Sequence, residues 1–117
     1  MTDPAGSGAR PPEVVRVWKG YGDAAGVERY CREHFTGTLL PQLRALTGFR
    51  GATVLVREAT DGSEVVVATR WDSLDAIRAF AGGSVDRAVV EPVVGELLER
   101  WDDGVTHFEV AVTDAVA

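Results

Sequence analysis

Residues 49–71 read FRGATVLVREATDGSEVVVATRW, two apolar runs joined by a short polar stretch. The runs Phe49–Arg57 and Glu64–Trp71 are rich in valine and threonine, residue types that favour strands. Between them stands Asp61-Gly62, a dipeptide typical of tight hairpin turns. We therefore expect an antiparallel hairpin at the centre of the chain, with the other elements arranged around it.

Upstream of the hairpin, the sequence predicts a strand and then a helix. Residues 13–20 (EVVRVWKG) have the β-branched and aromatic content of a strand, and Asp23 is placed to cap the helix that follows. At the spacing of an α-helix, one face of this helix carries Val27, Tyr30, Cys31, His34, Phe35 and Thr38. A short helical turn starting at Pro41 then ends at Gly48.

Downstream of the hairpin, Asp72 or Ser73 is expected to cap a second helix, which Gly82-Gly83 interrupts. A further helical stretch is expected from about Ser84, broken near Pro92 and continuing to Trp101. Residues 105–112 (VTHFEVAV) form the last expected strand. The order βαββαβ predicts a ferredoxin-like α+β fold, an antiparallel sheet with the helices on one face. We expect residues 13–117 to form this single domain and residues 1–12, rich in glycine, proline and alanine, to form a flexible tail.

The strands carry consecutive apolar residues, where a sheet with one wet face would alternate apolar and polar side chains. Valines are consecutive at positions 14–15 and 65–67, and Val54, Leu55 and Val56 follow one another. Both faces of the sheet are therefore expected to be covered, although one chain has too few helices to do so. A homodimer that packs sheet against sheet explains the pattern, and a monomer with an apolar open face is the alternative.

Composition narrows the classes of function. The 117 residues carry a net charge of −6 and a single lysine, which argues against nucleic acid as a partner. Cys31 is the only cysteine, so no intrachain disulfide can form and a reducing compartment, most simply the cytoplasm, is expected. The first residues lack the apolar run of a signal peptide, and no stretch approaches the length of a membrane span.

Several segments together resemble the antibiotic biosynthesis monooxygenases, a family of dimeric α+β barrels, over about residues 14–112. The resemblance rests on RVWKG, GFRGATVLVRE, the corner WDSLDAIRAFAG, DRAVVEP and VTHFEV. It implies a substrate pocket between the sheet and the helices of each subunit. It also implies an activity drawn from a family that includes cofactor-free oxygenases of polyketide aromatics and haem-degrading enzymes. The haem branch uses an asparagine on the first strand and a histidine on the second helix. This sequence contains no asparagine at any position and no histidine between Asp72 and Arg100, which disfavours haem degradation.

Three aromatic or imidazole side chains are the candidate catalytic residues. His34 lies on the inward helical stripe, and histidine is the side chain best suited to general-base catalysis near neutral pH. Tyr30, one turn earlier, could donate a hydrogen bond to a phenolic oxygen. Trp71, at the corner between strand and helix, could stack on a flat aromatic substrate. The alternatives are a half-solvated histidine, a tyrosine with its hydroxyl at the surface, and a tryptophan that anchors the core.

The candidate substrate-binding residues are Arg16, Trp18 and Phe35. Arg16 and Trp18 share one face of the first strand and could orient an anionic ligand, although an ion pair between subunits would explain them equally well. Phe35 follows His34 on the helical stripe. On the last strand, His107 is expected to look toward the dimer interface if Phe108 faces the helices.

One motif favours a different function. Gly20, Gly22 and Ala25 form GxGxxA after a strand, the setting of a dinucleotide-binding turn, but that fold requires parallel strands and an acidic residue about 20 positions further on. The alternative is a glycine-softened turn. No zinc-binding spacing, Walker loop or nucleophile elbow is present, so we predict neither a metal nor another cofactor.

The resemblance and the candidate residues together favour a cofactor-independent monooxygenase. Its substrate would be a flat, easily deprotonated aromatic small molecule of the polyketide type, made in secondary metabolism. A cyclase or isomerase acting on a related substrate is the first alternative. A dimeric module that binds a small molecule without catalysis is the second.

Overall fold

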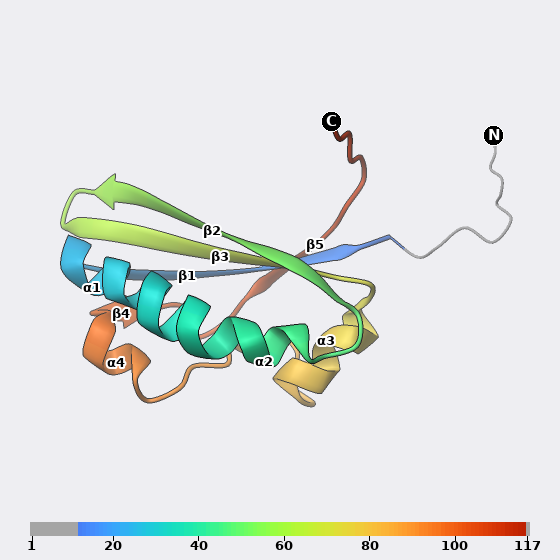
Figure 1. The fold of residues 1–117 in the computed structure, drawn as a ribbon, viewed down its shortest axis with the longest axis horizontal. Coiled ribbons are helices and arrows are strands. Elements are labelled where there is room, and N and C mark those ends of the chain that lie inside the picture. Colours follow the sequence, from blue (N-terminus) through green and yellow to red (C-terminus); the bar gives the residue numbers. More distant parts are fainter. Residues whose placement is uncertain (1–11, 117) are drawn as a thin grey trace, which may run out of the picture.

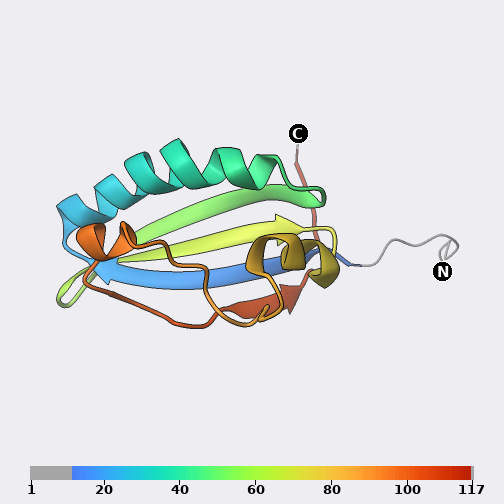
Figure 2. The same ribbon diagram turned by 90° about the horizontal axis from the view of Figure 1, so that it is seen from below.

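The computed structural model describes residues 12–116, which fold as one antiparallel sheet with the helices on one of its faces (Figure 1). The predicted flexible tail, residues 1–12, lies outside the described residues except for Pro12, which is exposed. Figure 2 shows the helices and the connection between the last two of them lying across the same side of the sheet.

The central hairpin is confirmed. Strand β2 (Phe49–Ala59) pairs antiparallel with β3 (Gly62–Trp71) along its whole length, with a bulge near Phe49. Only Thr60 and Asp61 separate the strands, so the turn falls one residue earlier than the Asp61-Gly62 signal suggested. Gly62 has a φ of +135°, a backbone conformation that residues with a Cβ rarely adopt, which explains the glycine at this point.

Strand β1 (Val14–Gly22) lies at the centre of the sheet. It pairs antiparallel with β3 on one side and, on the other, with two short strands, β4 (Arg100–Trp101) and β5 (Thr106–Glu109). The order β2-β3-β1-β4, with β5 beside β1, is that of a ferredoxin-like fold, and this prediction is confirmed.

One long helical segment follows β1, but it is not a regular α-helix. Asp23 caps α1 (Ala24–Arg29) by accepting a 2.6 Å hydrogen bond from the Gly26 amide, as expected. The chain then continues as a π-helix, η1 (Tyr30–Leu39), before it returns to α-helical geometry in α2 (Leu40–Arg44). The prediction of an α-helix was therefore wrong from Tyr30 to Leu39.

The second helix, α3 (Leu74–Ala81), begins where Ser73 accepts a 3.1 Å hydrogen bond from the Ala76 amide and ends at Gly82, whose φ is +75°. The helix expected from Ser84 is absent from the described residues. Residues 82–93, called the connecting segment below, are irregular, and a single turn, α4 (Val94–Leu97), follows them.

Backbone contacts and proline explain this difference. Pro92 cannot donate a helical hydrogen bond, and the Ala88 amide donates instead to the Asp103 carbonyl at 2.8 Å. Trp101, expected on a helix, lies in β4 and pairs with Gly20, because Leu98 already has extended backbone angles.

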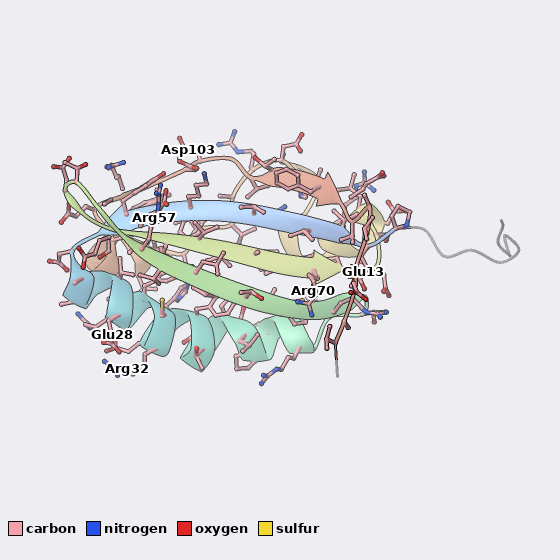
Figure 3. All side chains as sticks on the ribbon, turned by 90° about the horizontal axis from the view of Figure 1, so that it is seen from above. Glu13, Glu28, Arg32, Arg57, Arg70 and Asp103 are labelled. Carbon is pink, nitrogen blue, oxygen red and sulfur yellow. The ribbon has the colours of Figure 1, made fainter. Side chains whose placement is uncertain are left out.

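The two faces of the sheet differ. Toward the helices, Val65, Val67 and Trp71 are buried with the apolar side chains of every helix. On the opposite face, Phe108 is 55% exposed and Leu55 is 54% exposed. Partly buried aliphatic side chains lie between them on the central strands, namely Val15, Val17, Val66 and Ala68. Figure 3 views this face, and the labelled charges Arg57, Arg70 and Glu13 lie toward its two ends. We call this surface, from Leu55 to Phe108, the open face.

Candidate functional site

A small cavity lies between the sheet and the helices. Its volume is about 40 Å³, room for a few water molecules. Strands, helices and the connecting segment all line it: Arg16, Trp18, Tyr30, His34, Leu39, Leu43, Val67, Thr69, Phe80, Ala88, Val89, Val94 and Val105. Four of the six predicted site residues are therefore brought to one cavity.

The π-helical segment determines which helical residues reach this cavity. Tyr30, His34, Leu39 and Leu43 line it, and they follow one another at intervals of four, five and four residues. An α-helix repeats every 3.6 residues, so it would have rotated the later positions away from the cavity. This explains why Thr38, expected on the inward face, is exposed while Leu39 lies against the cavity.

Tyr30 and His34 are neighbouring side chains of the site. Their ring centroids lie 5.4 Å apart, and Trp18 stands on the other side of Tyr30 at 5.8 Å. Tyr30 and His34 are both buried, His34 being 6% exposed. Burial raises the pKa of Tyr30 well above its usual value, so the phenol remains a protonated hydrogen-bond donor at neutral pH.

Arg16 supplies a buried positive charge at the same cavity. Its guanidinium donates to the carbonyl oxygens of Val85 at 2.6 Å and Arg87 at 2.8 Å, which fastens the connecting segment to β1. It also lies 3.1 Å from Nε2 of His107 and 5.8 Å from the centroid of Phe80. These described partners are uncharged groups, and burial lowers the pKa of Arg16 without removing its charge.

His107 lies on the helix side of the sheet, so the condition for placing it at the dimer interface, Phe108 facing the helices, is not met. The register of β5 with β1 places His107 opposite Arg16, on the helix side, and directs Phe108 outward. Because a guanidinium can only donate, Nε2 of His107 must accept, which leaves the imidazole proton on Nδ1. Nδ1 lies 3.6 Å from a carboxylate oxygen of Asp86 in the connecting segment.

We expect acid to weaken the folded state through His107. Burial first, and then the charge of Arg16, lower the pKa of His107 below its usual 6.5. At a pH between the lowered pKa of the folded state and the usual value of 6.5, the unfolded chain binds a proton that the folded protein does not. This contribution to stability is therefore complete above about pH 6.5 and is lost as the pH falls toward the lower pKa of the folded state.

Urea unfolding at a series of pH values between about 8 and 5 measures this effect. His107→Gln retains an acceptor for Arg16 but cannot titrate. The free energy of unfolding of this variant should therefore fall less between about pH 8 and pH 5 than that of the natural protein. An identical pH dependence of the two free energies of unfolding would contradict the role given to His107.

Two predicted site residues do not line the cavity. Trp71 is fully buried, donates its indole N–H to the Thr69 hydroxyl at 2.8 Å, and packs between Phe49 and Phe80. Phe35 is buried in the hydrophobic core and is likewise absent from the cavity wall. The widened helical turn accounts for Phe35, because it brings His34 and then Leu39 to the cavity and leaves Phe35 beside them.

Several cavity residues were not singled out from the sequence. Thr69 could have been, since alternation on β3 places it on the same face as Val67 and Trp71. Phe80 and Ala88 come from segments whose contact with the sheet has no signal in local sequence. Glu91 lies outside the cavity wall and likewise has no local sequence signal; its Oε1 lies 3.6 Å from Nε2 of His34.

Other sequence features have structural roles. The GxGxxA motif does not begin a dinucleotide fold, because the strands beside it are antiparallel; a Cβ on Gly20 would lie 2.6 Å from Leu98. Burial raises the pKa of the Cys31 thiol, which disfavours the thiolate. Within residues 12–116, no cluster of three His, Cys, Asp or Glu side chains could hold a metal ion. No helix in this part of the chain is long and apolar enough to cross a membrane.

The fold is that of an α+β protein built like the antibiotic biosynthesis monooxygenases, and solved structures confirm this expected likeness of fold. No family model matches the chain, and no curated protein matches it in sequence.

Two solved structures show the likeness. One is a Bacillus cereus protein assigned to the antibiotic biosynthesis monooxygenases, with a TM-score of 0.60 and 22% identity, covering 90% of this chain and 99% of its own. The other is the monooxygenase from the gene ActVA-Orf6 of Streptomyces coelicolor, in complex with the ligand nanaomycin D. Its TM-score is 0.55 and its sequence identity 23%, and the match covers 98% of this chain and 95% of the S. coelicolor chain.

Proposed function

We propose that the protein is a cofactor-independent monooxygenase that oxidises a flat, acidic aromatic small molecule of the polyketide type. The observation that supports this best is the pairing, in one cavity, of a buried histidine with a buried arginine that contacts no carboxylate among the described residues. A base and a fixed positive charge are what is needed to form and stabilise a substrate anion. The nanaomycin D complex of the S. coelicolor monooxygenase supports a small-molecule ligand.

In this mechanism, His34 takes a proton from an acidic C–H group of the substrate. The resulting carbanion gives its electrons to dioxygen, and a bond forms between carbon and oxygen to give a peroxide. The proton held by His34 moves to the distal oxygen as the O–O bond breaks, and loss of the second C–H proton leaves a carbonyl group and water. Arg16, Tyr30 and Thr69 line the site where negative charge develops on the substrate oxygen. The substrate supplies all the electrons, so no flavin or metal is required.

A tricyclic aromatic requires far more than the present 40 Å³, since pockets for such ligands occupy about 300 Å³ or more. The connecting segment is the irregular part of the cavity wall, since Ala88 and Val89 line the cavity and the segment has no regular secondary structure. We therefore propose that a ligand of this size displaces the part of the segment that lines the cavity, at Ala88 and Val89. The hydrogen bonds of Arg16 to the carbonyls of Val85 and Arg87 hold it in place.

Oxygen uptake tests the proposal. Anthrone is a suitable probe, because the methylene opposite its carbonyl is acidic and its oxidation is balanced: anthrone and dioxygen give anthraquinone and water. With the uncatalysed rate subtracted, the proposal predicts one dioxygen consumed per anthrone. Turnover of anthrone or related phenols without oxygen uptake would indicate the cyclase or isomerase alternative.

The small volume of the cavity favours a second candidate, a binding module without catalysis, because its own side chains nearly fill the space. Such a protein would bind flat aromatics and release them unchanged. Saturable binding without loss of anthrone would support this second function over the first.

We further propose that the open face is the interface of a homodimer in the cytoplasm. Phe108 and Leu55 expose more than half of their surface there, at either side of partly buried valines. A second copy that packs its own open face against this one would remove both from water.

Replacing Phe108 with aspartate should convert the dimer to monomers at micromolar concentration, because burying an unpaired charge costs several kcal/mol. Sedimentation velocity measures the change. Leu74→Asp is a matched control, since Leu74 is also an exposed apolar residue but lies on α3, on the helix side. A natural protein that sediments as a monomer would contradict the proposed interface.

A further inference from the structure

Glu91 of the connecting segment faces His34 of the π-helical segment. Its carboxylate Oε1 lies 3.6 Å from the imidazole Nε2. This distance is too long for a hydrogen bond, but it lies within the range of an ion pair once the imidazole is protonated. The contact is therefore poised to tighten at the moment His34 takes up a proton.

His34 separates two hollows. On one side it lines the cavity between sheet and helices, and on the other it lines a second pocket formed with Glu33, Thr38, Glu91, Val93 and Leu97. Glu91 belongs only to the outer of these two sites. The imidazole thus has a bound molecule on one side and a carboxylate on the other, the arrangement in which a third group orients a catalytic base.

The other carboxylate of the outer pocket is already engaged. Glu33 forms ion pairs with Arg29 at 3.1 Å and Arg32 at 3.3 Å, whereas the ion pair of Glu91 in the described residues is with His34. The exposed fractions of the Glu33 and Glu91 side chains are 42% and 41%. Glu33 is therefore a closely matched control for Glu91.

The backbone of Glu91 is held outside the part of the segment at Ala88 and Val89, because the Val94 amide donates to the Glu91 carbonyl oxygen at 3.0 Å. Arg16 holds the carbonyls of Val85 and Arg87, and Ala88 is hydrogen-bonded to Asp103. The charge of Glu91 also reaches the cavity, since it contributes, after burial and Cys31, to the raised pKa of Tyr30.

We infer that Glu91 is a positioning residue for His34. Its carboxylate holds the proton on Nε2, leaves Nδ1 as the basic nitrogen, and stabilises the imidazolium that forms when His34 deprotonates the substrate. This inference rests on the proposed function. The proton passes from the substrate carbon to the imidazole and later to the distal peroxide oxygen, and Glu91 itself neither gains nor loses a proton.

Kinetics with anthrone provide the first test. Glu91→Gln should lower kcat about 10- to 100-fold, while KM stays within about threefold of the natural value. This loss of kcat is smaller than the loss of about 10²- to 10⁴-fold expected when the base itself is removed. Glu91→Asp should restore a large part of kcat, and Glu33→Gln should leave it unchanged. An unchanged kcat in Glu91→Gln, or a raised KM with kcat retained, would overturn the inference.

Nuclear magnetic resonance of protein labelled with ¹⁵N-histidine provides the second test, which does not depend on turnover. With His34 protonated, the natural protein and Glu33→Gln should show a slowly exchanging Nε2–H signal, assigned by its loss in His34→Ala. This signal should disappear in Glu91→Ala. Its persistence there, or its absence from the natural protein, would overturn the inference. A third outcome separates the two proposals. If the signal is lost only in Glu91→Ala but the natural protein does not oxidise anthrone, the pairing of Glu91 with His34 is supported and the proposed function is contradicted.

Discussion

Replacing His34 with alanine should lower the turnover of anthrone about 10²- to 10⁴-fold, the usual contribution of a general base. His34 is the histidine that lines the cavity, and it is 6% exposed, so a base at this position acts on a molecule shielded from water. The rate of oxygen uptake by the purified variant, compared with the natural protein at saturating anthrone, measures the loss.

The control for this variant is Cys31→Ser, which changes a half-buried side chain of the same π-helix that does not line the cavity. It should keep the turnover rate within about threefold, because a modest loss of packing does not affect the chemistry. Circular dichroism must show that both variants are folded. Full activity in a folded His34→Ala protein would show that His34 is not the catalytic base.

Replacing Trp71 with alanine should reduce the free energy of unfolding by about 3–5 kcal/mol. Trp71 is fully buried against Phe49 and Phe80, and its indole N–H is satisfied by Thr69. Removing the indole leaves a cavity where the hairpin meets α3. Because a small domain has only about 5–15 kcal/mol of stability, this variant should be close to unfolding. Chemical denaturation monitored by circular dichroism measures the loss.

Trp71→Phe distinguishes a core residue from a substrate contact. It preserves most of the buried volume, so stability should fall by less than in Trp71→Ala, while turnover of anthrone stays within a few-fold of the natural rate. A stable Trp71→Phe protein without activity would contradict a purely structural role and indicate that the indole contacts the substrate.

The hairpin, the cap at Asp23 and the ferredoxin-like order were predictable because their causes are local. A two-residue turn, a capping carboxylate and runs of β-branched residues each leave a pattern within a few positions. The π-helix was not predictable, since the stripe from Val27 to Thr38 was interpreted with a period of 3.6 residues. Thr38 was consequently assigned to the buried face, and Phe35, although buried as predicted, was assigned to the substrate site.

Contacts between distant segments explain the remaining errors. The spacing of Val94, Leu97, Leu98 and Trp101 fits a helix, yet only the first turn forms, because pairing with β1 draws Trp101 into the sheet. His107 lies on the helix side, in contact with Arg16, because β5 pairs with β1 in a register that places it opposite Arg16. Glu91 carries no pattern at all, since its meeting with His34 depends on the path of the connecting segment.

The most direct test of the proposed oxygenase activity uses ¹⁸O₂ and anthrone with the natural protein, without added metal or flavin. Mass spectrometry of the product should show one ¹⁸O atom incorporated into anthraquinone, and one labelled water formed, at a rate above that of the uncatalysed reaction. A product whose new oxygen comes from solvent, or a rate no greater than without protein, would contradict the assignment.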